Sequence, residues 1–469
     1  MASIATIPIE ILQQIFYFSC LNVSPDHKEV YAMMLGPSDG PSPVQHVLLH
    51  VCRRWHDAAS SASYLWSSIR ISWPRYSLLR EDKVKHFVRA VVQRSGTALL
   101  DIALIGKAWD EVAFILISES HRWRTLRVSN TYSPKQLWAY RTLQDKLPAL
   151  ESLAFASPVR PRESAETWKG YFEVMTMMLS NVPSLRSLDG YREMLFLPFP
   201  WAQITDFKIV SEPSVMVPTP LPHWSEGFTY CSSVLRLVIV GLAPKDDTKI
   251  LMPSVQELHC HHHGESWVSC FVLPALHTLS IPGTALANLQ VLLERSGCQL
   301  TTLILDVSPD WCWDDETVSD FHAIAPQLTH LKSLKVFLQE KFSPLRIVPH
   351  LASLLNPLSN DMFPRLEEFL LELRYQNETD GAMEMLRAAL VVMEGVIQPT
   401  LKFASVELAH CRGRGVGPLD AQPVFGLDEY SKLQTRARAD GVLTRVLLTD
   451  SDITQEVISG HVLVDDYLH

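Results

Sequence analysis

The sequence predicts an α/β repeat array, in which a curved parallel sheet carries helices or loops on its outer face, behind a small module of three short helical pieces at the N-terminus. Three observations support this fold class. A signature of one proline and two apolar positions recurs along the chain, a helix–turn–strand order occurs at two distant places, and the N-terminal residues have apolar positions at helical spacing. Recurrence of this kind is typical of folds that stack one supersecondary unit on the next.

The N-terminal module is expected to contain two helices and a short apolar plug. Pro8 fits the first turn of a helix, where its missing N–H would have no intrahelical partner. The apolar positions around it share one helical face: Ile7, Ile11, Leu12 and Ile15. A second helix over residues 44–59 and the plug complete the apolar set: Val47, Leu48, Val51, Cys52, Trp55, Leu65 and Trp66. A module this small cannot cover so much apolar surface by itself, which indicates a protein–protein contact.

Residues 8–16, 51–59 and 65–69 resemble the F-box, a family whose helices dock onto the Skp adaptor of a cullin–RING ubiquitin ligase. The resemblance implies adaptor contacts at Ile7, Pro8, Ile11, Leu12, Ile15, Leu48, Val51, Cys52, Trp55, Leu65 and Trp66. The sequence departs from the family pattern in having Ile7 where the family has Leu, and in a longer link over residues 22–43. We expect a loop insert at this link, and a solvated helix face at Arg53 and Arg54.

The repeated signature Pro-x-(Leu/Val)-x-x-(Leu/Phe) occurs at residues 148–153, 183–188, 253–258, 274–279 and 364–369. Versions without proline occur at residues 123–126, 204–207, 234–237, 331–334 and 403–406. We expect the proline at the first residue of a strand, where it removes no ladder hydrogen bond, and the two apolar residues in the core. The spacing of roughly 20 to 35 residues brackets that of leucine-rich repeats. The region is loosely similar to the leucine-rich-repeat F-box proteins of mushroom-forming fungi.

A longer unit occurs twice. A helix over residues 77–93 is followed by Arg-Ser-Gly and a strand over 99–104, and a helix over 286–293 is followed by Arg-Ser-Gly and a strand over 300–305. Gly96 and Gly297 can take the left-handed conformation that ends a helix. The predicted organisation is therefore a helical module over 1–72 with its insert at 22–43, an irregular leucine-rich-repeat-like array over 73–411, and a C-terminal cap over 412–469.

Composition excludes several functional classes. The formal charge of −10 argues against non-specific nucleic-acid binding, and no apolar run approaches the roughly 18 residues of a membrane span. Eight cysteines scattered over 469 residues do not form a disulfide framework. We expect a cytoplasmic or nuclear protein without a secretory leader.

The His-rich run over residues 259–263, with Cys270 and His277 beyond it, has donors of the types that bind zinc. Neighbouring side chains on a strand point to opposite faces, and the paired cysteines of zinc sites are missing. The run therefore favours a polar strand end over a structural metal. Residues 311–316 are either a Trp-containing contact loop or a helix start capped by Asp314 or Asp315.

No Gly-x-Ser-x-Gly or His-Glu-x-x-His motif is present, so we predict no enzyme, no catalytic residue, no metal and no cofactor. The prediction is a substrate-recognition subunit that binds a Skp-type adaptor and, through it, a cullin, and that holds an unidentified target protein for ubiquitin-dependent degradation. Two alternatives stay open. One is a scaffold outside ubiquitination, with or without docking blocked by the insert, and the other is a metalloprotein or enzyme built on the His-rich strand.

Overall fold

The computed structural model describes residues 7–24, 27–30, 33–35, 44–72, 81–105, 110–129, 141–155, 173–211, 224–241, 249–261, 265–307, 315–340, 363–375, 401–410, 443–449 and 454–458. The chain forms two compact units, residues 1–233 and 234–469. Each has a parallel sheet whose strands lie in the order of the sequence, so the α/β repeat prediction is confirmed. The predicted limits of the N-terminal module and of the C-terminal cap stay predictions.

The first unit begins with helices α1 (Ile9–Cys20), α2 (Val44–Val51) and α3 (Arg53–Ser61), followed by a 3₁₀ turn over Ser63–Trp66. The single helix expected over 44–59 is wrong. Cys52 has φ −161° and ψ 168°, an extended conformation that separates α2 from α3. Helix α1 packs against both of them, and the plug is buried, with the Trp66 indole N–H donating to the Ala59 carbonyl at 2.7 Å.

The link between α1 and α2 contains strands where a loop insert was expected. Strands β1 (Leu21–Ser24) and β2 (His27–Val30) pair antiparallel, and β3 (Met33–Leu35) pairs parallel with β4 (Ser68–Ser72). The outer edge of β4 would otherwise expose unpaired backbone groups, and β3 satisfies them. The insert therefore extends the sheet of the array.

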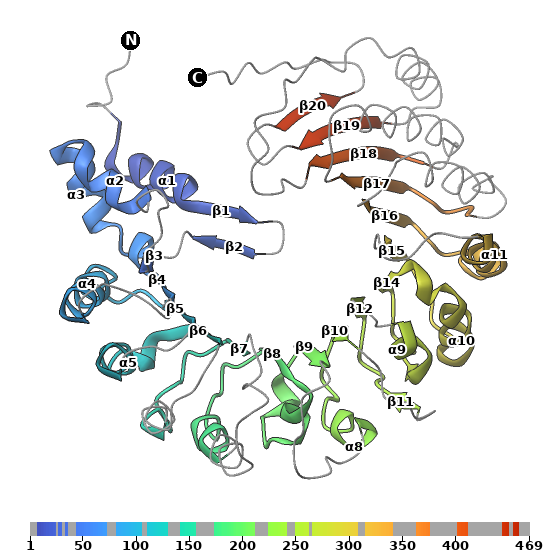
Figure 1. Cartoon of the computed structure of the whole chain (residues 1–469), viewed down its shortest axis with the longest axis horizontal. Coiled ribbons are helices and arrows are strands. Elements are labelled where there is room, and N and C mark those ends of the chain that lie inside the picture. Colours follow the sequence, from blue (N-terminus) through green and yellow to red (C-terminus); the bar gives the residue numbers. More distant parts are fainter. Residues whose placement is uncertain are drawn as a thin grey trace. The chain divides into compact units, whose positions relative to one another are not determined.

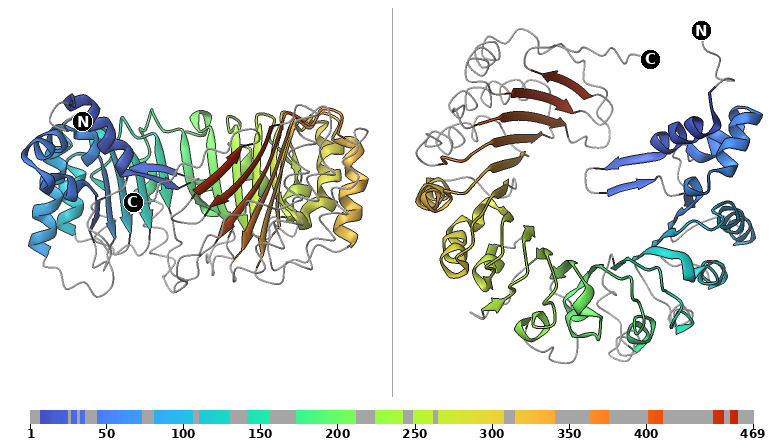
Figure 2. Two further views of the ribbon diagram at one scale, coloured as in Figure 1. Left: turned by 90° about the horizontal axis from the view of Figure 1, so that it is seen from above. Right: turned by 180° about the vertical axis from the view of Figure 1, so that it is seen from behind.

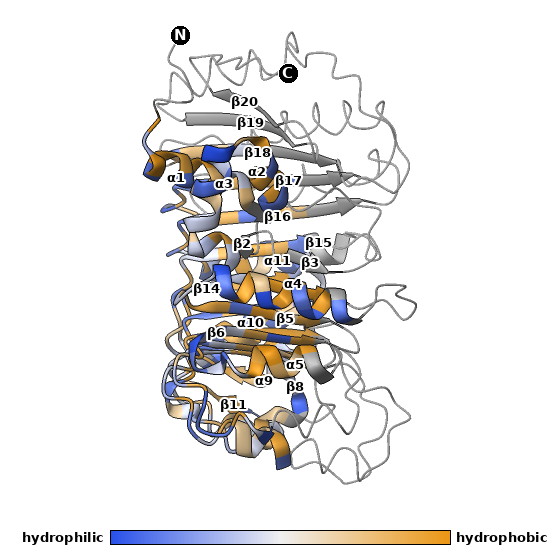
Figure 3. Ribbon diagram, turned by 90° about the vertical axis from the view of Figure 1, so that its left-hand side faces the viewer, coloured by the Kyte–Doolittle hydropathy of each residue, from blue (hydrophilic) through white to orange (hydrophobic). Residues whose placement is uncertain are grey.

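The rest of the first unit contains strands β5 (Leu100–Ile105), β6 (Trp123–Ser129), β7 (Ser152–Phe155), β8 (Ser187–Tyr191) and β9 (Asp206–Ser211). Its further helices are α4 (Glu81–Arg94), α5 (Asp110–Ile117) and α8 (Trp224–Phe228). In Figure 1, α4 and α5 lie on one side of strands β4 to β6. Hydrophobic and hydrophilic residues alternate along α4, as expected of a helix with one face on a core (Figure 3).

The second unit contains strands β10 (Arg236–Gly241), β12 (Glu257–His261), β14 (Thr278–Pro282), β15 (Thr302–Val307), β16 (Ser333–Glu340), β17 (Glu368–Tyr375), β18 (Phe403–His410) and β19 (Leu443–Thr449). Strand β20 (Thr454–Ile458) pairs antiparallel with β19. The nearly parallel course of β14 to β19 is visible in Figure 2.

Helices α9 (Glu265–Cys270), α10 (Leu286–Ser296) and α11 (Asp315–Ile324) cover one side of the second sheet, and β11 (Ile250–Leu251) pairs with β13 (Phe271–Val272) apart from it. The start of α11 at Asp315 agrees with the helix-start interpretation of residues 311–316, of which 311–314 lie outside the described residues. Residues 412–422, at the start of the predicted C-terminal cap, also lie outside them.

The signature residues build each coil in the same way, although the proline is not where we expected it. Each Pro is followed by its strand four residues later: Pro148 and β7, Pro183 and β8, Pro253 and β12, Pro274 and β14, and Pro364 and β17. The residue before each Pro accepts a hydrogen bond from the first apolar position, as from Leu150 to Leu147 at 3.3 Å. Proline thus occupies the second position of a turn, where its fixed φ fits.

The two apolar positions of each signature are core residues, as predicted. The second one aligns across neighbouring strands, giving one buried row in each unit. In the first unit the row is Ile69, Ile102, Leu126, Leu153, Leu188 and Phe207. In the second it is Leu237, Leu258, Leu279, Leu303, Leu334, Phe369 and Ala404. The signature expected at residues 403–406 is therefore at 401–404, because Leu401 and Ala404 are the buried pair.

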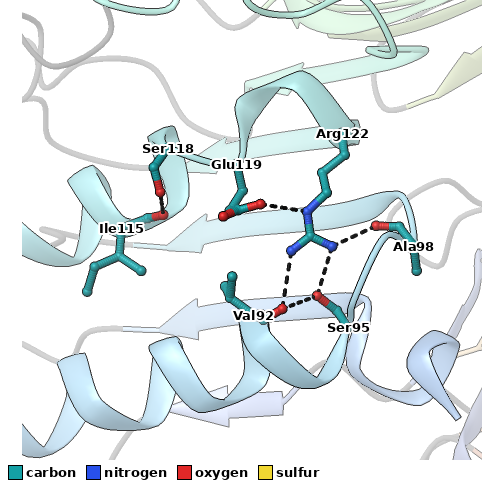
Figure 4. A network of polar contacts seen from close by, with 7 residues as sticks. All are labelled: Val92, Ser95, Ala98, Ile115, Ser118, Glu119 and Arg122. Carbon is teal, nitrogen blue, oxygen red and sulfur yellow. Dashed lines mark hydrogen bonds and ion pairs between the residues drawn. The ribbon is translucent and has the colours of Figure 1, made fainter. Parts of the chain in front are cut away.

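Both Arg-Ser-Gly sequences end a helix, with Gly96 at φ +53° and Gly297 at φ +58°. Behind the first, the buried Arg122 guanidinium donates to Ser95 Oγ and the Ala98 carbonyl at 3.0 Å each, and to the Val92 carbonyl at 3.2 Å (Figure 4). Its Nε donates to Glu119 at 2.8 Å. Arg122 therefore joins the polar groups at the end of α4, where the Ser95 hydroxyl also donates to the Val92 carbonyl at 2.7 Å. Carbonyls in the last turn of a helix need such partners because they have no intrahelical amide donor.

Candidate functional site

Helix α1 has two apolar sides. Leu12, Phe16 and Cys20 recur every four residues and are buried. On the opposite side, Ile11 is 46% exposed, Ile15 44% and Phe18 69%. The interior of the module covers only the first of these two sets of apolar side chains, and the second is left on the surface.

Helix α2 also has exposed apolar side chains. Val47 and Val51, one turn apart, are each 51% exposed, while Leu48 between them is buried. Because α2 packs against α1, these residues and those of α1 form the module surface, which we define as Ile9, Ile11, Ile15, Phe18, Val47 and Val51. Exposed apolar groups on two adjoining helices are the usual sign of a protein contact.

The structure divides the predicted adaptor residues into three groups. Pro8, Ile11, Ile15, Val51 and Cys52 are exposed, and Ile7 and Trp55 are half-buried. The remaining four are interior residues: Leu12, Leu48, Leu65 and Trp66. These four fold the module and offer no surface to a partner. The motif match could not separate the buried residues from the exposed ones. A sequence motif includes both the core residues that hold the helices together and the surface residues that contact a partner.

Sequence reasoning did not assign two further exposed residues of α1 to the site. Phe18, three residues after Ile15, is on the same helical face, so the same periodicity could have found it. Ile9, which is 39% exposed, is the first residue of the helix. The periodicity indicates it less clearly, because it is two residues from Ile11 and not one helical turn away.

Polar contacts hold the helices of the module in register. Gln13 Nε2 donates to the Ala58 carbonyl and to Ser61 Oγ, both at 3.1 Å, and thus joins α1 to α3. Arg54 was expected on a solvated face but is half-buried and donates to the Ile7 carbonyl. The Phe16 and Trp55 rings, 4.9 Å apart between centroids, pack at the same junction. The module surface is therefore presented by a fixed scaffold.

The His-rich strand divides its residues between two faces, as its alternation predicted. In β12, Cys260 is fully buried, whereas His259 and His261 lie on the other face with rings stacked at 6.4 Å. Burial, the nearby Arg236 and His261 lower the pKa of His259, and Glu257 opposes the shift. Among the described residues, which exclude 262–264, no group of three or more potential ligands is placed to hold a metal ion.

The buried thiols are chemically quiet. Burial raises the pKa of Cys20 to about 11, and burial also raises the pKa of Cys231 and Cys260 well above the ordinary range. A thiol is nucleophilic as the thiolate, so these three cysteines act as core residues.

In the part of the chain that the structure describes, no helix is both long and apolar enough to cross a membrane.

Comparison with known proteins adds little to these observations. No protein-family model matches the sequence, and no curated protein matches it significantly. Among solved structures, the Rad7 and Elc1 complex in yeast is similar, with a TM-score of 0.30 and 10% identity over 81% of this chain and 95% of the matched chain. The functional assignment therefore depends on the exposed side chains of this chain.

Proposed function

We propose that this protein is a substrate-recognition subunit of a Skp–cullin–F-box ubiquitin ligase. The N-terminal module binds a Skp-type adaptor, the repeat array binds a target protein, and a separate enzyme of the complex transfers ubiquitin. The observation that carries the proposal is the module surface, where six large apolar side chains between 39% and 69% exposed lie on two adjoining helices. The F-box-like sequence of these helices supports the identity of the partner.

The mechanism is tethering. A receptor that holds its target next to the transferring enzyme converts a bimolecular encounter into an effectively intramolecular one, which raises the local concentration of the target's lysines. This chain contributes no chemical step in the proposal. Its own residues supply two contacts, one for the adaptor and one for the target.

The deciding experiment is capture of purified full-length protein by a purified Skp-type adaptor. Ile11→Asp combined with Val51→Asp places charges in the module surface but leaves the interior residues intact, so capture should weaken by at least about tenfold. Phe114→Asp is the matched control, because Phe114 is 53% exposed on α5, outside the module. Its capture should equal that of the wild type.

Equal capture of the double variant and the wild type, with unchanged unfolding midpoints, would reject the adaptor contact. Failure of the wild type to bind the adaptor at all would favour the scaffold alternative, in which the same module works outside ubiquitination. Binding of the wild type that is lost in both variants would indicate a contact that does not use the module surface.

A further inference from the structure

The face of the first sheet that points away from its helices has two arginines in register. The parallel pairing aligns Arg70 of β4, Ala103 of β5 and Arg127 of β6, and continues to Ala154 of β7. Ile69 and Ile71, which flank Arg70, are buried in the core, so Arg70 has the opposite orientation. Strands lie about 4.8 Å apart, so two long cationic side chains stand on either side of one small residue.

The acidic side chains of this face are already paired with other cations. Asp101, two residues before Ala103, accepts from Arg124 Nε at 3.0 Å, and a register shift in the β5–β6 pair is what frees Arg124 to reach it. Asp189 of β8 faces Lys208 of β9 at 3.4 Å. Among the described residues, these pairs leave no carboxylate partner for the two arginines of the row.

In the described part of the chain, neither Arg70 nor Arg127 has a hydrogen-bond or ion-pair partner. Arg127 is exposed, and water can satisfy it. Arg70 differs, because its Nε is buried from solvent and unpaired. Removing a charged donor from water without giving it an acceptor is unfavourable. Only Nε is buried in this way, because Arg70 as a residue is half-buried. An incoming anion can therefore reach the terminal nitrogens and supply acceptors to a guanidinium that has none.

We propose that Arg70 and Arg127 bind one anionic side chain, a carboxylate or a phosphate, of the target polypeptide above Ala103. The guanidinium group is suited to this because its planar N–H donors match the two oxygens of a carboxylate and also a pair of phosphate oxygens. The small side chain of Ala103 leaves room for the anion between the two arginines. The inference rests on the proposed function only in taking a polypeptide as the source of the anion.

The test uses small anions, so its result does not depend on the adaptor or on knowing the target. The unfolding midpoint of the full-length protein is measured against increasing inorganic phosphate, O-phosphoserine and N-acetylglutamate, at constant ionic strength. A ligand that binds only the folded state raises the midpoint with concentration. Arg70→Gln and Arg127→Gln should each weaken the apparent affinity by about tenfold, the loss of roughly 1.4 kcal/mol.

Arg89→Gln is the matched control, because it removes the same charge from an exposed position on α4. It should leave the affinity unchanged. A midpoint that does not rise with any of the three anions, or that rises equally in all variants, would overturn the proposal. A response to the two phosphates alone points to a phosphorylated target segment, and a response that includes N-acetylglutamate points to an acidic one.

A second readout separates recognition from a structural role. Without added anion, Arg70→Met should unfold at the same midpoint as the wild type or at a higher one, because it removes an unsatisfied buried donor. A midpoint several degrees lower would mean that Arg70 stabilises the sheet, and would overturn the assignment even if the anion response were lost.

Discussion

In each sheet, one row of aligned residues points into the core and the next row points away from the helices. We call these the inward and the outward row. The inward rows of the two sheets are alike, and the outward rows differ. Inward, both have a line of large apolar residues that are 0–1% exposed, except that Ala404 stands at the end of the second. Outward, the central row of the first sheet is small and charged: Arg70, Ala103, Arg127, Ala154, Asp189 and Lys208. The corresponding row of the second mixes larger aliphatic side chains with polar ones: Val238, His259, Ser280, Ile304, Lys335, Leu370 and Ser405.

This difference separates what stacking requires from what it leaves free. Each coil must bury its two signature residues against the next coil, so the inward row is restricted to apolar side chains in both units. The outward row has no such partner. It can therefore change in composition without altering the backbone register. Each row takes part in an interstrand ion pair, Asp189 with Lys208 in the first unit and Lys335 with Glu368 at 3.8 Å in the second. Half-buried larger aliphatic groups such as Ile304 occur only in the second row.

The largest expected effect tests whether the inward rows are equivalent. Leu126→Ala in the first unit and Leu279→Ala in the second should each lower the free energy of unfolding by about 2–5 kcal/mol, because each leaves a cavity in a packed core. Val238→Ala, at a half-buried outward position, should cost about 0.5 kcal/mol. Denaturant unfolding monitored by circular dichroism measures all three.

A cost for Val238→Ala as large as that for Leu279→Ala would show that the outward row is also a core. A large difference between the two inward variants would break the equivalence of the units.

The two Arg-Ser-Gly sequences provide a smaller and sharper contrast. At the first sequence, Arg122 from the following coil donates to the polar groups at the helix end. At the second, Ser296 Oγ accepts from the Leu273 N–H at 2.9 Å. Arg295 is exposed there and donates only to the Ser269 carbonyl. Arg122→Met should therefore cost about 2–3 kcal/mol. Arg295→Met should cost about 0.5 kcal/mol or less. Similar costs in thermal unfolding would contradict this assignment of roles.

The smallest effect concerns pH and His259. Its pKa is lowered in the folded state from the ordinary 6.5, first by burial and then by Arg236 and His261. The unfolded chain therefore binds a proton more readily, and this contribution to stability is full above pH 6.5 and declines as the pH falls toward the folded value. His259→Gln should flatten the fall in unfolding free energy between about pH 7 and 5. An unchanged pH profile would exclude His259 as its source.

Much of the array follows from the sequence because its signature records a local requirement. A turn followed by two inward residues three apart demands the same residue types in every coil, so the buried pairs at 150 and 153 or at 276 and 279 can be assigned without a structure. The left-handed glycines at 96 and 297 can be assigned for the same reason. The shift at 401–404 was missed because Ala404 is a weak apolar signal beside Phe403.

Other features were decided only by tertiary structure. Helix periodicity marks Leu12 and Ile15 equally as apolar, and only the packing of α1 on its neighbours buries one and exposes the other. The break at Cys52 and the pairing of β3 with β4 likewise depend on distant partners. The alignment of Arg70 with Arg127 depends on strand register across separate coils. The sequence determines which residues each coil must bury. Which apolar side chains remain exposed, and which residues lie beside one another on neighbouring strands, is decided only when the coils pack together.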